Sequence, residues 1–201
     1  MNILISIDSF KGSMTSMQAG NAAKKGILKA VPDAEAVVCP LADGGEGTTD
    51  ALIEGMSGEK IELEVTGPLG ETVSCYYGWL EESRTAVMEM ASAAGLTLVN
   101  EKKPMMATTY GVGEMILDAA KRGCEKVIIG IGGSATNDGG IGMLQAFGYQ
   151  FLDKNRKDVG KGVAALGKVE MIIADKVNPL ISKILFMVKK EPHIYLVRRK
   201  A

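Results

Sequence analysis

The sequence predicts an α/β protein in which a Rossmann-like or flavodoxin-like parallel sheet forms a first lobe, and an alternating β meander leads into a second α/β lobe. Two apolar runs, residues 3–7 and 36–39, are separated by a stretch of helix formers at 15–29. Continuous apolar strands joined by helices are typical of parallel sheets that are covered on both faces. Between residues 59 and 90, apolar and polar side chains alternate instead, which is typical of antiparallel strands with one solvated face.

The first lobe is predicted over residues 1–58, with the order strand, helix, strand, helix. The helix at 15–29 closes at Pro32 and carries a polar face of glutamine and lysine side chains. A second helix is expected over 49–56, where nearby glycines end it. This region therefore contains the first repeats of a parallel α/β sheet.

The second lobe is predicted over residues 59–180 and is incomplete. An antiparallel block between α/β segments interrupts the parallel pattern, so we expect it to start a second lobe rather than to extend the first sheet. The expected elements are strands at 60–65, 72–77 and 85–90, followed by helices at 110–122 and 137–147 and strands at 127–131 and 149–152.

The last segment, residues 181–201, is expected to form an aberrant or disordered tail. No glycine follows Gly167, although glycine is abundant before it, and basic clusters at 189–190 and 198–200 lie on either side of Pro192. The character of the chain changes here.

Composition excludes several classes of protein. The chain has 201 residues, a formal net charge of -1 and a pI near 6.0, so it has no general attraction for nucleic acid or for acidic membranes. No window approaches the length of a membrane span. His193 is the only histidine, which makes a Ser-His-Asp hydrolase improbable. Cys39, Cys75 and Cys124 form no paired motif, so we expect buried structural thiols in a reducing cytoplasm.

The first of three polar loops is Asp8-Ser-Phe-Lys-Gly-Ser13, which follows the first predicted strand. The carboxyl ends of strands in open α/β sheets are where ligands bind. Lys11 could neutralise a phosphate or carboxylate, and Asp8 could hold Mg²⁺ or accept a hydroxyl proton, while Ser9 and Ser13 supply hydroxyls. The alternative is that Asp8 and Ser9 only cap the helix and that Lys11 is solvated.

The second loop, Ala42-Asp-Gly-Gly-Glu-Gly-Thr48, places Asp43 and Glu46 close together. Two carboxylates flanked by glycines cost stability unless a cation or a substrate hydroxyl compensates them. Gly44 and Gly45 let the backbone approach a ligand, and Thr48 can cap the next helix. A plain acidic turn is the alternative.

The third loop, Gly130-Ile-Gly-Gly-Ser-Ala-Thr-Asn-Asp-Gly-Gly140, follows a buried strand and exposes many backbone N–H groups, as phosphate sites do. A pair of hydroxyls, Thr108 and Thr109, opens a helix upstream, where helix capping and close packing are the favoured reading when the segment is taken alone. We expect all three loops to share one site. The candidate binding residues in the third loop are Gly132, Gly133, Ser134, Thr136, Asn137, Asp138 and Gly139.

The third loop also fits a dinucleotide fingerprint. Gly130, Gly132 and Ala135 have G-x-G-x-x-A spacing, and Asp153 follows at a suitable distance. An NAD(P)-dependent oxidoreductase is therefore an alternative reading. Against it, the next residues are polar and glycine-rich, whereas the fingerprint leads into an apolar helix. The chain contains no Walker motif.

With these residues in view, the chain resembles the type I glycerate kinases, bacterial enzymes that phosphorylate glycerate with ATP. The resemblance rests on the first and second loops, on Thr108-Thr-Tyr-Gly-Val-Gly-Glu114 and on Gly132-Gly-Ser-Ala-Thr-Asn-Asp-Gly-Gly140, in that order. It runs from Met1 to about Leu180 and implies a two-lobed cytoplasmic kinase that uses ATP and Mg²⁺. Members of the family are nearly twice as long, so the remainder is expected to be missing here.

If the resemblance holds, catalysis is in-line phosphoryl transfer by positioned charges. Lys11 would steady the substrate carboxylate or the transferring phosphate, and the third loop would bind the ATP phosphates. Asp43, Glu46 and Asp138 are the candidate Mg²⁺ ligands, and one of the carboxylates would accept the glycerate proton. The residues expected to be catalytic are Asp8, Lys11, Asp43 and Asp138.

The rival interpretation is an inactive truncated fragment or a ligand-binding remnant, which could dimerise or aggregate through exposed sheet edges. Residues 193–200 can be encoded so that a neighbouring reading frame gives a segment typical of the family, which suggests a frameshifted or deleted gene. Sequencing the locus tests that hypothesis.

Overall fold

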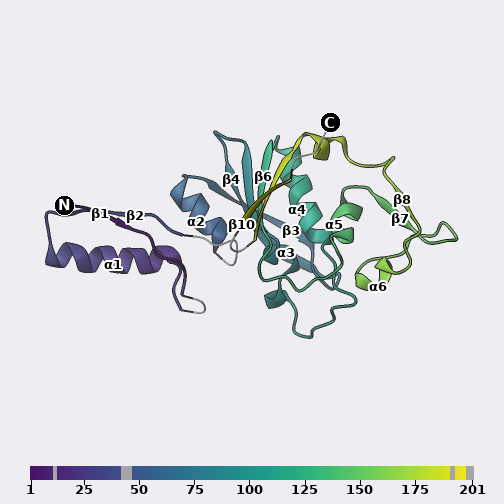
Figure 1. Ribbon diagram of the computed structural model, residues 1–201, viewed down its shortest axis with the longest axis horizontal. Helices are drawn as coiled ribbons and strands as arrows, with labels where there is room; N and C mark the ends of the chain where they lie inside the picture. Colours follow the sequence, from purple (N-terminus) through teal and green to yellow (C-terminus); the bar gives the residue numbers. More distant parts are fainter. Residues whose placement is uncertain (11–12, 42–46, 191–192, 198–201) are drawn as a thin grey trace.

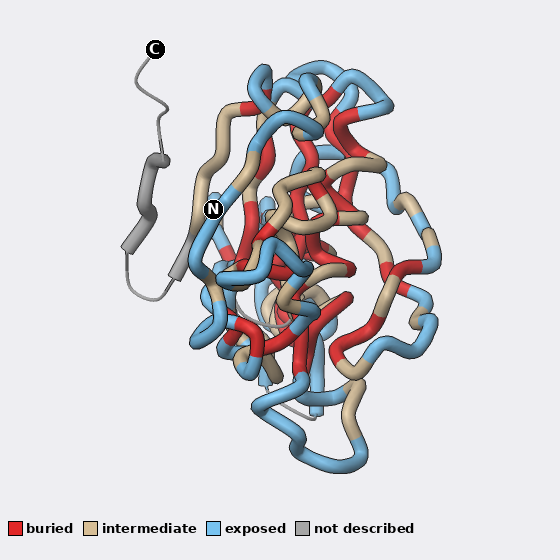
Figure 2. The backbone as a smooth tube through the Cα atoms, turned by 90° about the vertical axis from the view of Figure 1, so that its right-hand side faces the viewer, coloured by how far each residue is buried: buried red, intermediate tan, exposed pale blue. Residues whose placement is uncertain are grey.

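The computed structural model describes residues 1–10, 13–41, 47–190 and 193–197. The described residues form an N-terminal arm and a larger sheet lobe, which are apart in Figure 1. Figure 2 shows that the buried segments run through the centre of the molecule, with exposed loops around them. The predicted α/β class is confirmed.

The arm consists of β1 (Asn2–Ile5), α1 (Ser16–Ala30) and β2 (Glu35–Val38), with β1 parallel to β2. α1 begins where the sequence predicts, because Thr15 and Gln18 form a capping box. Figure 1 shows α1 running along one side of the two strands. A Cβ atom at Gly20 of α1 would lie 2.4 Å from Val38 Cγ1, so helix and strand are in close contact.

The sheet lobe begins with α2 (Thr48–Gly55) and a six-stranded mixed sheet of order β10-β9-β6-β5-β4-β3. β3 (Glu59–Thr66), β4 (Thr72–Leu80) and β5 (Thr85–Glu89) form the predicted antiparallel meander. β6 (Lys126–Gly130) and β9 (Leu185–Lys190) then run parallel to β5, and β10 (His193–Val197) is antiparallel to β9. The meander and the parallel strands therefore belong to one sheet, separate from that of the arm.

The remaining elements connect and cover this sheet. They are α3 (Ala91–Ala94), η1 (Leu96–Leu98), α4 (Tyr110–Lys121), α5 (Ile141–Ala146), β7 (Gln150–Leu152), α6 (Val163–Leu166), β8 (Met171–Ile173) and η2 (Pro179–Lys183). β7 and β8 form a small antiparallel pair outside the main sheet.

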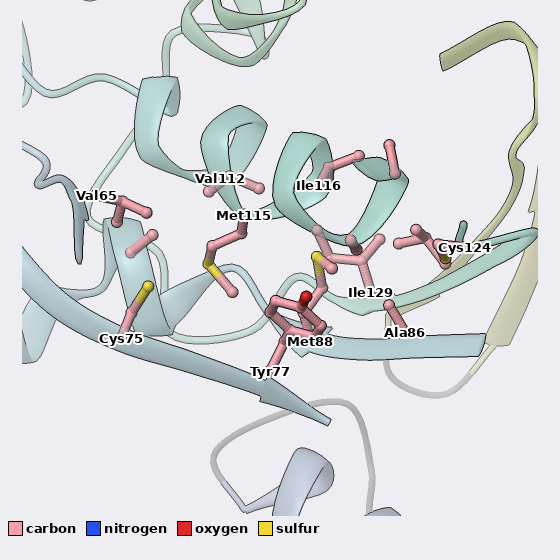
Figure 3. Packing of buried hydrophobic residues seen from close by; sticks show 14 of the residues in the cluster. Val65, Cys75, Tyr77, Ala86, Met88, Val112, Met115, Ile116, Cys124 and Ile129 are labelled. Atoms are coloured by element: carbon pink, nitrogen blue, oxygen red, sulfur yellow. The ribbon is translucent and has the colours of Figure 1, made fainter. Parts of the chain in front are cut away.

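The core of the sheet lobe lies between α4 and the sheet. Figure 3 shows Met115 and Ile116 of α4 facing Tyr77 of β4 and Met88 of β5, and all four side chains are fully buried. The Tyr77 hydroxyl donates to Asp118 Oδ2 at 2.7 Å, and burial together with this carboxylate raises the pKa of Tyr77. A buried tyrosine is thus satisfied within the core.

The expectation of one solvated face is wrong for β5. All five of its residues are buried, because α2 packs on the face of the sheet opposite α4. The close approach is visible at Gly78 of β4, where a Cβ atom would lie 2.6 Å from Ile53 Cγ1 of α2. The alternating pattern predicted the strand correctly but not its second covering layer.

Two other local predictions need correction. The helix expected over 137–147 begins only at Ile141, because Gly139 and Gly140 have positive φ values of 64° and 80° and form a turn before it. The prediction of buried thiols holds for Cys75 and Cys124 but is wrong for Cys39, which is exposed at the end of β2.

The division into residues 1–58, 59–180 and 181–201 remains a prediction. The described part of the last segment is not irregular, since it contains the end of η2, β9 and β10. β9 pairs with β6 from Lys126↔Leu185 to Gly130↔Lys189.

Candidate active site

The candidate site lies at the carboxyl ends of β5 and β6. Glu89 ends β5, Gly130 ends β6, and the two are direct neighbours in the sheet. The Met90 N–H donates to the Gly130 carbonyl at 2.9 Å, which continues the pairing one step beyond the strands. This is the edge of a parallel sheet at which ligands bind.

The glycine-rich loop leaves β6 at this edge and is held against α3. The Ala135 N–H donates to the Ala94 carbonyl at 2.8 Å, and the Leu96 N–H donates to the Gly133 carbonyl at 2.9 Å. Gly133 has a φ of 68°, a conformation that favours glycine. The loop is therefore fixed on both sides of Ser134.

Inside the loop, Ser134 and Thr136 bind each other. Ser134 Oγ lies 2.8 Å from Thr136 Oγ1 and accepts from the Thr136 N–H at 3.0 Å. Asn137 and Gly139 are exposed beyond this turn. The two hydroxyls thus stabilise the turn, and these exposed residues of the loop follow it.

Asp138 is the most deeply buried carboxylate of the site, with 1% of its surface exposed. Its Oδ2 accepts from the Thr109 N–H at 2.8 Å and from the Gly142 N–H at 3.2 Å. Its Oδ1 accepts from the Gly140 N–H at 3.1 Å, and Thr109 Oγ1 lies 3.0 Å from Oδ2. Asp138 therefore ties the glycine-rich loop to the first turns of α4 and α5.

The structure leaves the predicted roles of Asp138 as base or metal ligand untested. In the arrangement described, both of its oxygens accept hydrogen bonds from the protein. Thr109 shares this bracing role, because its Oγ1 also accepts from the Met143 N–H at 3.0 Å.

Glu89 is a second buried carboxyl, and the sequence analysis did not select it. Its Oε1 accepts from the Thr49 N–H at 2.8 Å, at the start of α2. Burial raises the pKa of Glu89, although the Thr49 amide favours its charged form. Its place directly after the apolar run Ala86-Val-Met88 was the available signal.

The other predicted residues fall into two groups. Thr108 and Thr48 are buried in the sheet lobe, and the Thr108 N–H donates to the Pro68 carbonyl at 2.9 Å. Asp8, Ser9 and Ser13 belong to the arm, where the Ser9 N–H donates to Asp8 Oδ1 at 2.7 Å. The structure thus gathers the 108–109 and 132–140 residues at one place.

Five predicted residues lie outside the described part of the chain: Lys11, Asp43, Gly44, Gly45 and Glu46. Among the residues that are described, no group of three histidine, cysteine, aspartate or glutamate side chains is placed to hold a metal ion. The predicted convergence of all three loops, and the predicted Mg²⁺ ligands, therefore stay predictions.

A cavity of about 980 Å³ adjoins the glycine-rich loop. Ser134, Thr136 and Asn137 supply polar groups to it, and most of its wall is apolar, with contributions from Ile116 of α4 and Val188 of β9. Its size is within the usual range of small-molecule pockets.

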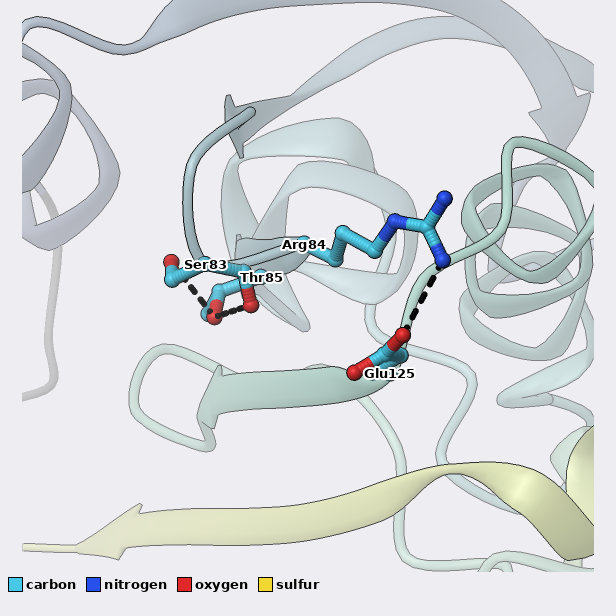
Figure 4. A network of polar contacts seen from close by, with 4 residues as sticks. All are labelled: Ser83, Arg84, Thr85 and Glu125. Carbon is cyan, nitrogen blue, oxygen red and sulfur yellow. Dashed lines mark hydrogen bonds and ion pairs between the residues drawn. The ribbon is translucent and has the colours of Figure 1, made fainter.

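The opposite ends of β5 and β6 have a different character. Figure 4 shows Arg84 beside Glu125, with Nη1 and Oε1 3.0 Å apart, and both side chains are mostly exposed. An exposed pair of this kind contributes little to stability. Among the described residues, the buried polar side chain at this end is Thr85, whereas the buried carboxyls Glu89 and Asp138 lie at the carboxyl edge of these two strands.

Within the described residues, no helix has the length and apolar character needed to cross a bilayer. A family model described as the Glycerate kinase family matches residues 3–197, which extends past the expected limit near Leu180. Glycerate kinase of Halalkalibacterium halodurans is 45% identical over 188 residues, which make up 92% of this chain and 50% of that protein. Glycerate 2-kinase of Escherichia coli is 44% identical over 181 residues, 89% of this chain and 48% of that protein.

Among solved structures, the chain is similar to a crystal structure assigned to glycerate kinase 2 of Salmonella typhimurium LT2, with a TM-score of 0.87 and 40% identity. The similarity covers 94% of this chain and 51% of that one. The chain spans about half the length of the curated relatives it matches. The extent and identity of these matches show that the chain belongs to the glycerate kinase family.

Proposed function

We propose that this chain carries part of an ATP-dependent glycerate kinase, which transfers the terminal phosphoryl group of ATP to a hydroxyl of glycerate. Its family supports this reaction class. The observation that carries the proposal is the glycine-rich loop, which is fixed by α3 and Asp138 at the carboxyl edge of β6.

The loop suits the phosphates of a nucleotide. Within the described residues, the N–H groups of Gly133 and Gly139 donate to no protein acceptor, and both residues are exposed with positive φ. Free backbone N–H groups in a glycine-rich loop are suited to bind an anion. The neighbouring cavity, which is mostly apolar but is also lined by Ser134, Thr136 and Asn137, suits the rest of a nucleotide.

Phosphoryl transfer needs a positioned hydroxyl and a group that accepts its proton. Asp8 and Asp43 remain proposed for that role, and Lys11 for charge neutralisation. Glu89 joins them, because a buried carboxyl with a raised pKa at the carboxyl edge is suited to accept a proton.

Mg²⁺ does not fit the described residues. No three-ligand cluster is present among them, and the oxygens of Asp138 accept from backbone N–H groups. We therefore assign no step to the metal, and Asp43 and Glu46 remain its proposed ligands.

The oxidoreductase alternative receives no support. In the dinucleotide fingerprint a helix begins within the glycine pattern, whereas here α5 begins only at Ile141, beyond a polar turn. The remnant alternative stays open for this chain, because its relatives are about twice as long.

The test is turnover of ATP and D-glycerate, measured on this chain and on a fusion that adds the unmatched half of the Halalkalibacterium halodurans relative. We expect the fusion to form phosphoglycerate, and phosphorus NMR identifies the hydroxyl that is modified. Lys11→Ala, Asp43→Ala and Glu89→Gln should each reduce turnover at least about 100-fold, as expected for lost acid-base or charge stabilisation.

The matched control is Arg84→Ala, at the opposite end of the strand that bears Glu89. It should leave turnover unchanged. A folded fusion that binds NADH but not ATP, or that makes no phosphoglycerate, would overturn the proposed function. Activity of the fusion without activity of this chain would identify the chain as a remnant.

A further inference from the structure

Thr49 is a buried polar residue that the function described so far does not use. It is the second residue of α2, and none of its surface is exposed. Within the described residues, its Oγ1 is buried without a hydrogen-bond partner, a state that it shares only with Gln145 Oε1. Burying a hydroxyl without a partner costs free energy, so a buried atom of this kind is expected to have a specific reason.

The position of Thr49 leaves its hydroxyl without the usual acceptor. Inside a helix, a threonine hydroxyl can donate to the carbonyl four residues earlier. α2 begins at Thr48, so no helical turn precedes Thr49. The methyl group of Thr49 faces the sheet, because a Cβ atom at Gly78 of β4 would lie 3.5 Å from Thr49 Cγ2. The side chain is therefore held between α2 and the sheet, with its hydroxyl still to be satisfied.

The carboxyl of Glu89 is the acceptor group that lies beside Thr49. Glu89 is only 7% exposed, and its Oε1 accepts from the Thr49 N–H at 2.8 Å. The hydroxyl belongs to the same residue as this N–H, so a small side-chain rotation brings it within hydrogen-bond distance of the carboxyl. Burial raises the pKa of Glu89, and the amide and hydroxyl of Thr49 act against burial by favouring the charged form.

Few charged groups face Glu89 from the elements packed against it. On α2, Asp50 raises the pKa of Glu89, and Tyr76 of β4 donates to Asp50 Oδ2 at 3.1 Å. The neighbour of Glu89 in β6 is Gly130, and α3 contains only alanine and serine. No basic side chain forms an ion pair with Glu89 among the residues that the structure describes. The groups that favour its charged form are thus hydrogen-bond donors at the start of α2.

We propose that Thr49 is a positioning residue for phosphoryl transfer, whose hydroxyl donates a hydrogen bond to the Glu89 carboxylate and holds it ready to accept the proton of the substrate hydroxyl. The inference rests on the proposed role of Glu89 as a proton acceptor. In that step the substrate oxygen bonds to the terminal phosphorus of ATP, the bond from this phosphorus to the ADP oxygen breaks, and the substrate proton moves to Glu89. A hydroxyl donates to a carboxylate and accepts from a carboxylic acid, so Thr49 serves Glu89 before and after the transfer.

A role in packing alone fits the structure less well. Valine has nearly the shape of threonine and would fill the same space between α2 and the sheet. It would do so without burying a hydroxyl that lacks a partner. The hydroxyl of Thr49 is therefore explained by the carboxyl beside it and not by the space that the side chain fills.

The test compares Thr49→Val and Thr49→Ser with the unmodified chain. Valine keeps the backbone N–H that binds Glu89 Oε1 but removes the hydroxyl, whereas serine keeps both. Carbon-13 NMR of the glutamate carboxyl groups follows the protonation of Glu89, and Glu89→Gln assigns its signal. We expect the titration midpoint of Glu89 to move to higher pH in Thr49→Val and to stay near the unmodified value in Thr49→Ser, because only valine removes a donor to the charged form.

The matched control is Thr85→Val, at the opposite end of β5. Thr85 is also buried, and its hydroxyl donates to the Ser83 carbonyl at 3.1 Å. This variant should leave the titration midpoint of Glu89 unchanged.

Turnover of the fusion described above provides a second readout. At neutral pH, Thr49→Val should lower kcat at least about tenfold with little change in the KM for ATP, because a hydrogen bond to the proton acceptor is lost. The acidic limb of the pH profile should move to higher pH, and Thr49→Ser should restore both quantities.

Two outcomes would overturn the proposal. The first is a titration midpoint of Glu89 that is the same in folded Thr49→Val as in the unmodified chain. The second is a midpoint that Thr49→Ser moves as far as Thr49→Val does. If Thr49→Val does not fold, Thr49→Ala allows the same measurement with a smaller side chain. The titration needs no turnover, so an unmoved midpoint contradicts the role of Thr49, whereas a fusion that makes no phosphoglycerate contradicts the proposed function.

Discussion

The strands of the sheet lobe and those of the arm differ in how many of their faces are covered by helices. In the sheet lobe, α4 covers one face of β5 and α2 covers the other, so the strand is buried along its whole length. In the arm, α1 covers one face of β1 and β2, and Leu4 and Val37 stay exposed on the other. The comparison teaches that an apolar strand pattern predicts the strand, but not whether the same chain provides both covering layers.

The largest expected effect comes from removing the brace of the sheet lobe with Asp138→Ala. Two buried and one partly buried backbone N–H groups lose their acceptor, at about 1–3 kcal/mol each, so the free energy of unfolding should fall by about 4 kcal/mol. Urea denaturation followed by circular dichroism measures this. Arg84→Ala, which removes an exposed pair, should cost no more than about 1 kcal/mol. If both variants lost the same unfolding free energy, the buried hydrogen bonds of Asp138 would contribute no more than an exposed ion pair, and the prediction would be wrong.

Apolar truncation compares the two regions directly. Met115→Ala deletes a fully buried side chain and should cost about 2–5 kcal/mol. Leu4→Ala in the arm should change stability by no more than about 0.5 kcal/mol, because Leu4 is already exposed. Thermal denaturation of the two variants measures the difference. If Leu4→Ala lowered the free energy of unfolding as much as Met115→Ala does, the side chain of Leu4 would have to be covered in this chain.

The pH dependence of the sheet lobe should include a contribution from Glu89. Burial raises its pKa above the ordinary value of 4.5, so the folded state retains a proton that the unfolded state has lost. This contribution to stability is fully present below pH 4.5 and is lost as pH rises through the raised pKa. Glu89→Gln should therefore be more stable than the unmodified chain at pH 8, and the difference should shrink towards pH 4. Urea denaturation at several pH values measures this difference. If the two proteins differed in unfolding free energy by the same amount at pH 4 and pH 8, Glu89 would not contribute to the pH dependence.

The smallest effect is expected from Gly26→Ala in the arm. No atom lies within 4 Å of the position that a Cβ atom would take, and the residue is inside α1, so alanine should stabilise by about 0.5–1 kcal/mol. In the sheet lobe, Gly142→Ala should destabilise instead, because its Cβ atom would lie 2.2 Å from Thr108 Oγ1. Thermal denaturation of the two variants measures this difference. The melting temperature should rise for Gly26→Ala and fall for Gly142→Ala, and a fall for Gly26→Ala would contradict the prediction.

Much of the fold could be predicted from local patterns. The alternating strands, the start of α1 at Thr15 and the loop after β6 all follow from neighbouring residues. Burial of β5 on both faces could not be predicted, because α2 comes from an earlier part of the chain. The exposure of Cys39 was missed for a similar reason, since it depends on where β2 ends in the arm.

Of the residues named from the sequence, Thr109 lies against the glycine-rich loop in the structure. The site itself and the roles of its residues stay predictions. The bracing contacts of Asp138 could not be foreseen, because Thr109 is 29 positions away in the sequence. Glu89 was missed because a glutamate at the end of an alternating strand normally reads as a solvated side chain.

The arm and the sheet lobe can each be followed by fluorescence, through a dye on Cys39 in the arm and through Trp79 in the sheet lobe. Burial raises the pKa of Cys75 to about 12 and also raises that of Cys124, which suppresses the thiolate that reacts with maleimides. A maleimide dye at neutral pH should therefore attach to exposed Cys39 at the end of β2, while Trp79 of β4 reports from the other region. Following both emissions in one denaturation experiment will show whether the two regions melt as a single cooperative unit.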